Sequence, residues 1–133
     1  MRRDAMRIFD ASSIINLCGA RKVDRLMDGC TLSLAFYEVG NAVWRLVYRD
    51  KKIAMEDGRI ILDSLSSAIG TIELVEAGDA LEILGLAVEE GLTYYDAAYL
   101  HAAIKNSLIL VTDDETLYRS AKKHVKTIKS EEI

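Results

Sequence analysis

The sequence predicts one α/β domain in which helices flank a mostly parallel central sheet. Short apolar runs alternate along the chain with longer amphipathic segments, which is the pattern of strands joined by crossover helices. The run Leu108–Val111 is apolar without interruption, as expected of a strand buried on both faces of a sheet. The 133 residues contain no proline and no linker, so we expect a single domain spanning residues 1–133.

The first half of the chain is expected to hold two strands and four helices. Ser12 and Ser13 offer N-cap hydroxyls to a short helix that closes at Gly19, and a turn at Asp28-Gly29 separates the next helix from the second strand. Two longer helices then follow on the 3.6-residue spacing of their apolar side chains. Besides the short helix, the predicted elements are a strand at Met6–Phe9, a helix at Val23–Met27, a strand at Thr31–Leu34, and helices at Ala35–Arg49 and Ala54–Ile69.

The second half alternates three strands with three helices. The helix that stops at Gly91 is expected to turn Leu81, Leu84 and Val88 toward the core. A strand is predicted at Thr71–Val75, then helices at Asp79–Glu90 and Tyr94–Asn106, the strand Leu108–Val111, a helix at Glu115–Lys123 and an edge strand at Val125–Ile128.

Acidic residues follow two of the predicted strands and sit in the early turns of two helices. Asp10 comes directly after the first strand, and Asp113 and Asp114 follow Leu108–Val111 after one threonine. Glu38 and Asp96 lie near the starts of their helices. Because ligand sites of parallel sheets form at the carboxyl ends of the strands, we expect these acids to converge at one edge.

Clustered carboxylates repel one another, so they indicate a bound cation. In metal-free protein at least one of them is expected to have a raised pKa. Hard oxygen ligands suit Mg²⁺ or Mn²⁺. Such a cation activates water and stabilises a phosphoryl transition state, so the pattern favours metal-dependent hydrolysis of phosphodiesters.

Charge and hydropathy narrow the class of protein. The net charge of −4 argues against nucleic-acid binding, although acids gathered around a cation would weaken that objection. No apolar run approaches the roughly 20 residues of a membrane helix.

Cys18 and Cys30 fit no disulfide framework, so a cytoplasmic protein is expected. Two basic clusters are interpreted first as solvated surface: Arg45, Arg49, Lys51 and Lys52, and Lys122, Lys123, Lys126 and Lys129.

Four short motifs, in this order, resemble those of the PIN-domain ribonucleases, and within them the small VapC-type toxins. The motifs are FDASS at 9–13, YEVGNA at 37–42, TYYDAAY at 93–99 and LVTDDETL at 110–117. The resemblance covers nearly the whole chain. Gly40 departs from the pattern, since a helix former is more usual there and glycine costs a helix roughly 1 kcal/mol against alanine; a close backbone approach at this position would account for it.

The resemblance implies roles for individual residues. Its main acids match Asp10, Glu38 and Asp96, and the acid of the T-x-D pattern matches Asp114, with Asp113 as a lesser metal ligand at the variable position. Thr112 matches a hydroxyl near the metal-bound water, and Ser12 and Asn41 match polar supports of the acids. The implied protein is a PIN-like Mg²⁺- or Mn²⁺-dependent endoribonuclease that acts on RNA, forms a homodimer and is restrained by a small antitoxin protein.

Other functions fit the sequence less well. A phospho-acceptor module and a D-x-D phosphatase both need a second acid after the first strand, where this chain has Ala11 and Ser12. A housekeeping RNA-processing or RNA-binding PIN protein with reduced catalytic activity remains the alternative. Tyr94, Tyr95 and Tyr99 are interpreted first as core or dimer packing and second as surfaces for stacking RNA bases.

Overall fold

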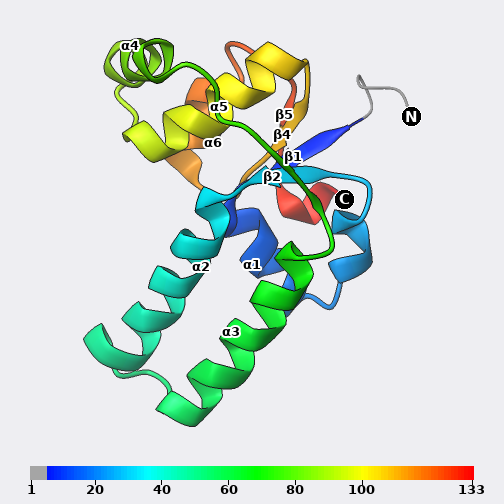
Figure 1. The fold of residues 1–133 in the computed structure, drawn as a ribbon, viewed down its shortest axis with the longest axis vertical. Helices are drawn as coiled ribbons and strands as arrows, with labels where there is room; N and C mark the ends of the chain where they lie inside the picture. Colours follow the sequence, from blue (N-terminus) through cyan, green and yellow to red (C-terminus); the bar gives the residue numbers. More distant parts are fainter. Residues whose placement is uncertain (1–5) are drawn as a thin grey trace.

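Parallel strands form the centre of the molecule. The computed structural model describes residues 6–133, and within them five strands make one sheet in the order β3-β2-β1-β4-β5. Every neighbouring pair in that sheet is parallel (Figure 1). The strands are β1 (Arg7–Phe9), β2 (Cys30–Leu32), β3 (Glu73–Val75), β4 (Ile109–Val111) and β5 (Thr127–Ile128). The first five residues of the predicted domain lie outside the described residues.

Helices cover both faces of the sheet, with α4, α5 and α6 on one side and α1, α2 and α3 on the other (Figure 1). Within residues 6–133 none of them is long and apolar enough to cross a membrane. The α-helices are α1 (Ala11–Gly19), α2 (Leu34–Trp44), α3 (Met55–Ile69), α4 (Ala80–Glu90), α5 (Tyr94–Asn106) and α6 (Glu115–Ala121). Shorter turns are η2 (Val23–Leu26), η3 (Arg45–Arg49) and η4 (Ser130–Glu132).

The two faces of the sheet support two hydrophobic clusters because successive strand residues point to opposite faces. Ile8 and Leu110 pack with the α4, α5 and α6 side, and Phe9 and Val111 pack with the α1, α2 and α3 side. Alanines dominate the buried face of α5, which lets that helix lie close to the strands. The carboxyl ends of β1 and β4 are thus held by packing on both sides.

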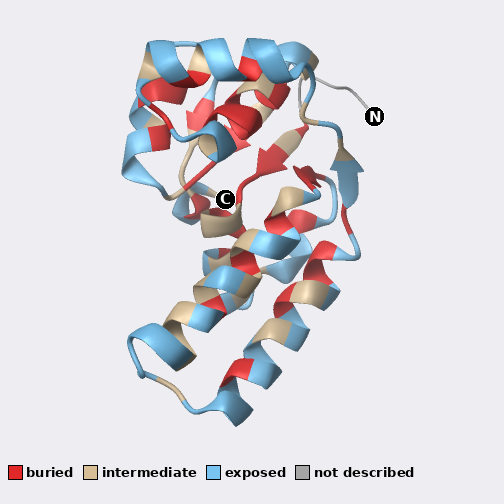
Figure 2. Cartoon of the chain, turned by 60° about the vertical axis from the view of Figure 1, so that its left-hand side comes forward, coloured by how far each residue is buried: buried red, intermediate tan, exposed pale blue. Residues whose placement is uncertain are grey.

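Helices α2 and α3 extend beyond the sheet as an arm (Figure 1). Figure 2 shows that most residues toward its tip are exposed or half-buried. Gly58 lets the two helices approach, since a Cβ at that position would lie 2.6 Å from Cγ2 of Val47. Gly40 has no such role, because nothing lies within 4 Å of a Cβ built there. The suggestion of a close backbone approach at Gly40 is therefore wrong.

The predicted α/β class and the parallel sheet are confirmed, with two local differences. The expected helix 35–49 is α2 followed by the π-helical turn η3. The expected inward stripe of α4 is wrong: Leu81 and Val88 are 78% and 76% exposed, and Ile83 and Ala87 face the core instead. Apolar residues occur on two sides of this helix, so periodicity alone did not decide which side is buried.

Candidate metal centre

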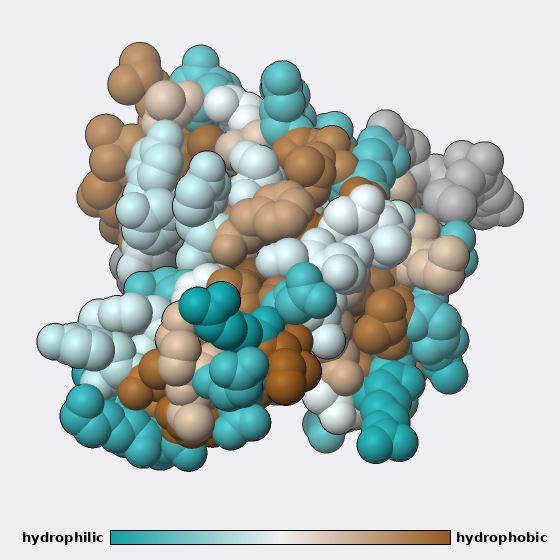
Figure 3. Space-filling view, turned by 60° about the horizontal axis from the view of Figure 1, so that its bottom comes forward, coloured by the Kyte–Doolittle hydropathy of each residue, from teal (hydrophilic) through white to brown (hydrophobic). Residues whose placement is uncertain are grey.

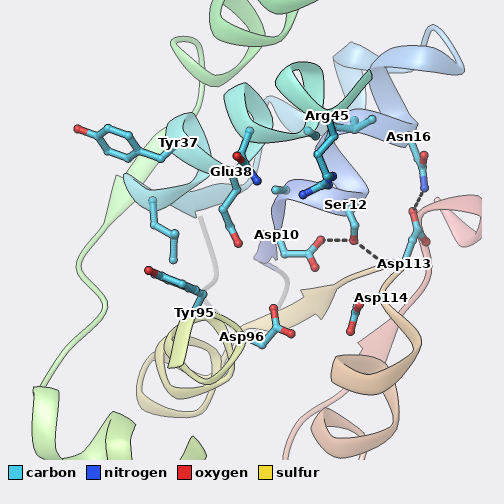
Figure 4. A pocket seen from close by; sticks show the side chains of 15 residues that line it. Asp10, Ser12, Asn16, Tyr37, Glu38, Arg45, Tyr95, Asp96, Asp113 and Asp114 are labelled. Carbon is cyan, nitrogen blue, oxygen red and sulfur yellow. Dashed lines mark hydrogen bonds between the residues drawn. The ribbon is translucent and has the colours of Figure 1, made fainter. Parts of the chain in front are cut away.

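The predicted acids surround one pocket at the carboxyl ends of β1 and β4. The pocket measures about 760 Å³. The acids come from four separate parts of the chain, and Figure 4 shows the carboxylates of Asp10, Glu38, Asp96 and Asp114 turned toward the same space. Its lining includes all the predicted acids, Asp10, Glu38, Asp96, Asp113 and Asp114, together with Ser12, Asn16, Tyr37, Asn41, Arg45 and Tyr95.

Asp10 is the most deeply held of these acids. It ends β1 and caps α1, where its Oδ1 accepts hydrogen bonds from the Ser13 amide at 2.9 Å and the Ser12 hydroxyl at 2.8 Å. The Thr112 hydroxyl donates to Oδ2 at 2.5 Å. Burial raises the pKa of Asp10 above its ordinary 3.8, although these hydrogen bonds act in the opposite direction. The carboxylate is therefore fixed in place by donors from two strand ends.

Ser12 and Thr112 link those two strand ends through their hydroxyls. Besides donating to Asp10, the Ser12 hydroxyl accepts from the Asp113 amide at 3.0 Å, and the Thr112 hydroxyl accepts from the Asp114 amide at 3.1 Å. Thr112 is fully buried. Both side chains thus support Asp10 and shape the turn that presents Asp114.

Glu38 lies in the first half of α2 and receives a hydrogen bond that was not predicted. The hydroxyl of Tyr99, a fully buried residue of α5, donates to its Oε1 at 2.7 Å. Burial raises the pKa of Glu38 above 4.5; the Tyr99 hydrogen bond opposes this shift, and the charge of Asp10 adds to it. Tyr99 thereby orients Glu38. Tyr99 lies three residues after Asp96 and therefore on the same side of the helix. This spacing is the feature of the sequence that could have predicted a place for Tyr99 near the acids.

Asp96 is a half-buried acid with a strongly raised pKa. It sits in the first turn of α5, where its amide donates to the N-cap hydroxyl of Thr93 at 3.1 Å. Burial and then the charges of Asp114, Asp10 and Glu38 raise the pKa of Asp96 from 3.8 to about 7. The expectation of a raised pKa in the cluster is confirmed. Asp114, Asp10 and Glu38 are therefore close enough to oppose the ionisation of Asp96.

Asp113 and Asp114 are neighbours with different surroundings. Asp114 caps α6, its Oδ2 accepting from the Leu117 amide at 2.8 Å. Asp113 accepts from the Asn16 amide group at 2.7 Å and from the backbone and hydroxyl of Ser130 at 2.9 and 2.5 Å. Burial alone would raise its pKa, but the hydrogen bonds from Ser130 and Asn16 outweigh burial and lower it. The Asp113 carboxylate is thus engaged with the C-terminal turn η4.

Asn41 and Arg45 line the pocket from α2 and η3. In residues 6–133 Asn41 makes no hydrogen bond to any of the acids, so it does not support them as Ser12 does. Figure 4 shows Arg45 reaching over the pocket between Glu38 and Ser12. It brings a positive charge to the rim of a cluster that is otherwise acidic.

The donor set fits a hard divalent cation, but the carboxylates stand apart. No group of three His, Cys, Asp or Glu side chains in the described part of the chain is close enough to chelate one ion. This differs from the expected close approach. Mutual repulsion accounts for it, because drawing several carboxylates together requires a cation's charge between them. Burial is the largest cause of the raised pKa of Asp96, and the charges of Asp114, Asp10 and Glu38 raise it further.

Comparison with known proteins adds a family to this geometry. The sequence model of the PIN domain family matches residues 8–123. The chain belongs to the PIN domain family. It is 34% identical over 91 residues to a protein named Exonuclease VapC9 from Pyrobaculum aerophilum, an alignment that covers 68% of this chain and 65% of that protein. The chain thus spans slightly less than two thirds of that relative's length.

A solved structure agrees with this assignment. The crystal structure of PAE2754 from Pyrobaculum aerophilum matches this PIN domain with a TM-score of 0.83 and 29% identity, covering 96% of this chain and 92% of that one. The resemblance to VapC-type PIN domains, drawn from four short motifs, is confirmed.

Proposed function

We propose that this PIN domain is a Mg²⁺- or Mn²⁺-dependent endoribonuclease that hydrolyses phosphodiester bonds of RNA. The observation that carries the proposal is the acid cluster, in which three neighbouring carboxylates help to raise the pKa of Asp96 to about 7. Carboxyl groups with perturbed pKa values, gathered around a pocket, are typical of functional sites. The family match supports nuclease chemistry in general, since a relative is named an exonuclease.

Asp10, Glu38, Asp96 and Asp114 would hold the cation, with Asp113 in a structural role. A bound divalent cation supplies an activated water and stabilises charge on the phosphoryl group. Ser12 and Thr112 fix Asp10, and Tyr99 fixes Glu38, so two ligands keep their orientation when the ion arrives. Arg45 is suited to a phosphate of the RNA, because it lines the same pocket and its guanidinium offers paired donors.

The biological role we propose is that of a toxin in the cytoplasm, held in check by a small antitoxin protein. The VapC-type resemblance favours it. A groove of about 370 Å³ between α2 and α3, lined by Val43, Trp44, Val47 and Leu62, offers a concave apolar surface to an amphipathic segment. Co-expression with the product of a neighbouring small reading frame tests this role, since suppression of toxicity is expected.

The decisive assay compares wild type with Asp10→Asn on single-stranded RNA, in Mg²⁺, in Mn²⁺ and in EDTA. Asp10→Asn keeps the shape and removes a charge, so cleavage should be lost while the fold remains. Equal cleavage by both proteins would overturn the proposed site. Circular RNA decides the mode of cleavage: an endonuclease opens it, whereas an exonuclease, as the relative's name suggests, leaves it intact.

The alternative is a housekeeping RNA-processing or RNA-binding PIN protein with reduced activity. It would be favoured if wild type binds metal and RNA but cleaves neither linear nor circular RNA. Titration calorimetry with Mn²⁺ and a gel-shift assay with the same RNA would reveal that outcome.

A further inference from the structure

One end of the pocket is aromatic. Tyr37 on α2 directly precedes Glu38, and Tyr95 on α5 directly precedes Asp96, so each ring is placed by the same helical turn as an acid. Both tyrosines line the pocket, and they are 79% and 59% exposed. In Figure 4 they lie at the same end, away from the hydrogen-bonded end formed by Asp113 and Asn16.

Neither exposed tyrosine has a structural role comparable to that of Tyr99. In the described residues neither ring takes part in a ring pair or a cation–π contact, and neither hydroxyl makes a hydrogen bond. Tyr99, on the same helix as Tyr95, is fully buried and bonded to Glu38. The packing of the domain therefore does not account for two large rings at the mouth of the pocket.

The chemistry next to these rings indicates what would cover them. Single-stranded RNA is recognised largely by stacking of unpaired bases on exposed aromatic side chains. When a phosphate of an RNA strand lies over the acids, the bases on either side of that phosphate lie near the two ends of the pocket. One of these ends offers two aromatic rings. The other side offers the polar pair Asn16 and Asp113 instead.

We propose that Tyr37 and Tyr95 form a base-stacking subsite for single-stranded RNA on one side of the scissile phosphate. The position of that phosphate rests on the proposed nuclease function, whereas the stacking itself does not. The subsite would be tolerant of base identity, because every base presents a π-face. It would also be one-sided, so the RNA should lie across the pocket in a fixed direction.

Fluorescence of 2-aminopurine, which falls when the base stacks, tests the proposal without any cleavage. Short single-stranded RNAs with 2-aminopurine at successive positions are titrated with protein in EDTA. We expect quenching at one or two adjacent positions. Tyr37→Leu and Tyr95→Leu should each relieve the quenching and weaken RNA binding about tenfold. Tyr37→Phe and Tyr95→Phe should keep the quenching and the affinity, because a phenyl ring also stacks. Tyr94→Leu is the matched control, since Tyr94 is exposed beside Tyr95 but does not line the pocket.

Several results would overturn the subsite: no quenching at any position, quenching that survives both Leu variants, or equal loss in Tyr94→Leu. A change of oligomeric state in the Leu variants would overturn it too, because the rings would then belong to a protein interface. Tyrosine-dependent quenching by a protein that never cleaves RNA would reject the nuclease function and keep the subsite. Cleavage of RNA without quenching would keep the nuclease function and reject the subsite.

Discussion

At the scale of single residues, side-chain hydroxyls decide how Asp10 and Glu38 are held. Ser12 and Thr112 each donate to one oxygen of Asp10, and Tyr99 donates to one oxygen of Glu38. A donated hydrogen bond favours the ionised carboxylate and partly offsets the burial that raises its pKa. The hydroxyls thus keep the buried Asp10 and the half-buried Glu38 available for a cation.

Tyr99→Phe tests this role at Glu38. The phenyl ring still fills the core, so the free energy of unfolding should fall by only about 1 kcal/mol. Without its donor the pKa of Glu38 should rise further, so that cation affinity at neutral pH decreases. Calorimetric titration with Mn²⁺ measures that affinity, and Tyr94→Phe serves as the control. An unchanged affinity would mean that Tyr99 acts only in packing.

Asp113→Asn and Asp114→Asn should have opposite effects. The Asp113 carboxylate accepts three hydrogen bonds, so its loss should destabilise the fold by about 1–3 kcal/mol and affect cleavage little. Asn is as good a helix N-cap as Asp, so Asp114→Asn should keep its stability and lose cleavage. Denaturant unfolding and the RNA assay measure the two quantities. The reverse pattern would make Asp113 the metal ligand.

At the scale of helices, the end of α2 sets the position of Arg45. The helix changes there to the π-helical turn η3, a distortion that is frequent at functional sites. Arg45 begins this turn and lines the pocket, whereas Arg49 ends it and pairs with Asp50 at 2.9 Å. Of these two arginines, four residues apart, only Arg45 has a side chain that lines the pocket.

Arg45→Ala should weaken RNA binding and make it less sensitive to salt, because a phosphate contact is lost. Arg49→Ala, on the same turn but away from the pocket, should do neither. The measurement is the slope of log affinity against log salt concentration, for which about one unit less is expected in Arg45→Ala. Identical slopes in both variants would exclude a phosphate contact by Arg45.

The sequence predicted the strands and the acids because both depend on local patterns. Unbroken apolar runs identify buried strands, and acids that follow them must lie at the sheet edge. The contact of Tyr99 with Glu38 and the buried side of α4 were not predicted. Both depend on which side of a helix faces the sheet, and tertiary packing decides that. The engagement of Asp113 with Ser130 joins residues 17 apart, and no local pattern predicts it.

At the scale of the whole molecule, the acid cluster should make stability depend on pH. The folded state binds a proton at Asp96 up to pH of about 7, while the unfolded chain loses it near 3.8. Metal-free protein should therefore lose stability as pH rises from about 4 to about 7 and change little above. The raised pKa values of Asp10 and Glu38 act in the same direction. Asp113, whose pKa is lowered, acts oppositely but only below about 4.

Addition of Mn²⁺ should reverse this loss. The ion competes with protons, so the midpoint of thermal unfolding should rise more at pH 8 than at pH 5. Asp96→Asn should flatten the pH dependence and reduce the effect of the ion. The same pH dependence in Asp96→Asn and wild type would contradict the assignment to this cluster.

On the outer face of α4, apolar side chains are exposed to solvent. Leu81, Leu84 and Val88 are exposed at helical spacing, and two copies of such a convex stripe can pack against each other about a two-fold axis. The arm differs, because its apolar groups line the concave groove between α2 and α3 and are interspersed with polar ones on the face seen in Figure 3. A groove fits an inserted partner segment better than its own copy.

We therefore expect a homodimer that forms through α4. In sedimentation velocity at micromolar concentration, wild type should be a dimer and the double variant Leu84→Glu, Val88→Glu a monomer, because glutamates facing each other across the axis repel. Ile60→Glu on α3 is the matched control, being exposed to a similar degree, and should remain a dimer. Dissociation of the control instead would move the interface to the arm. A wild type that stays monomeric would leave α4 free for another protein, since an apolar stripe of this length is unfavourable in water.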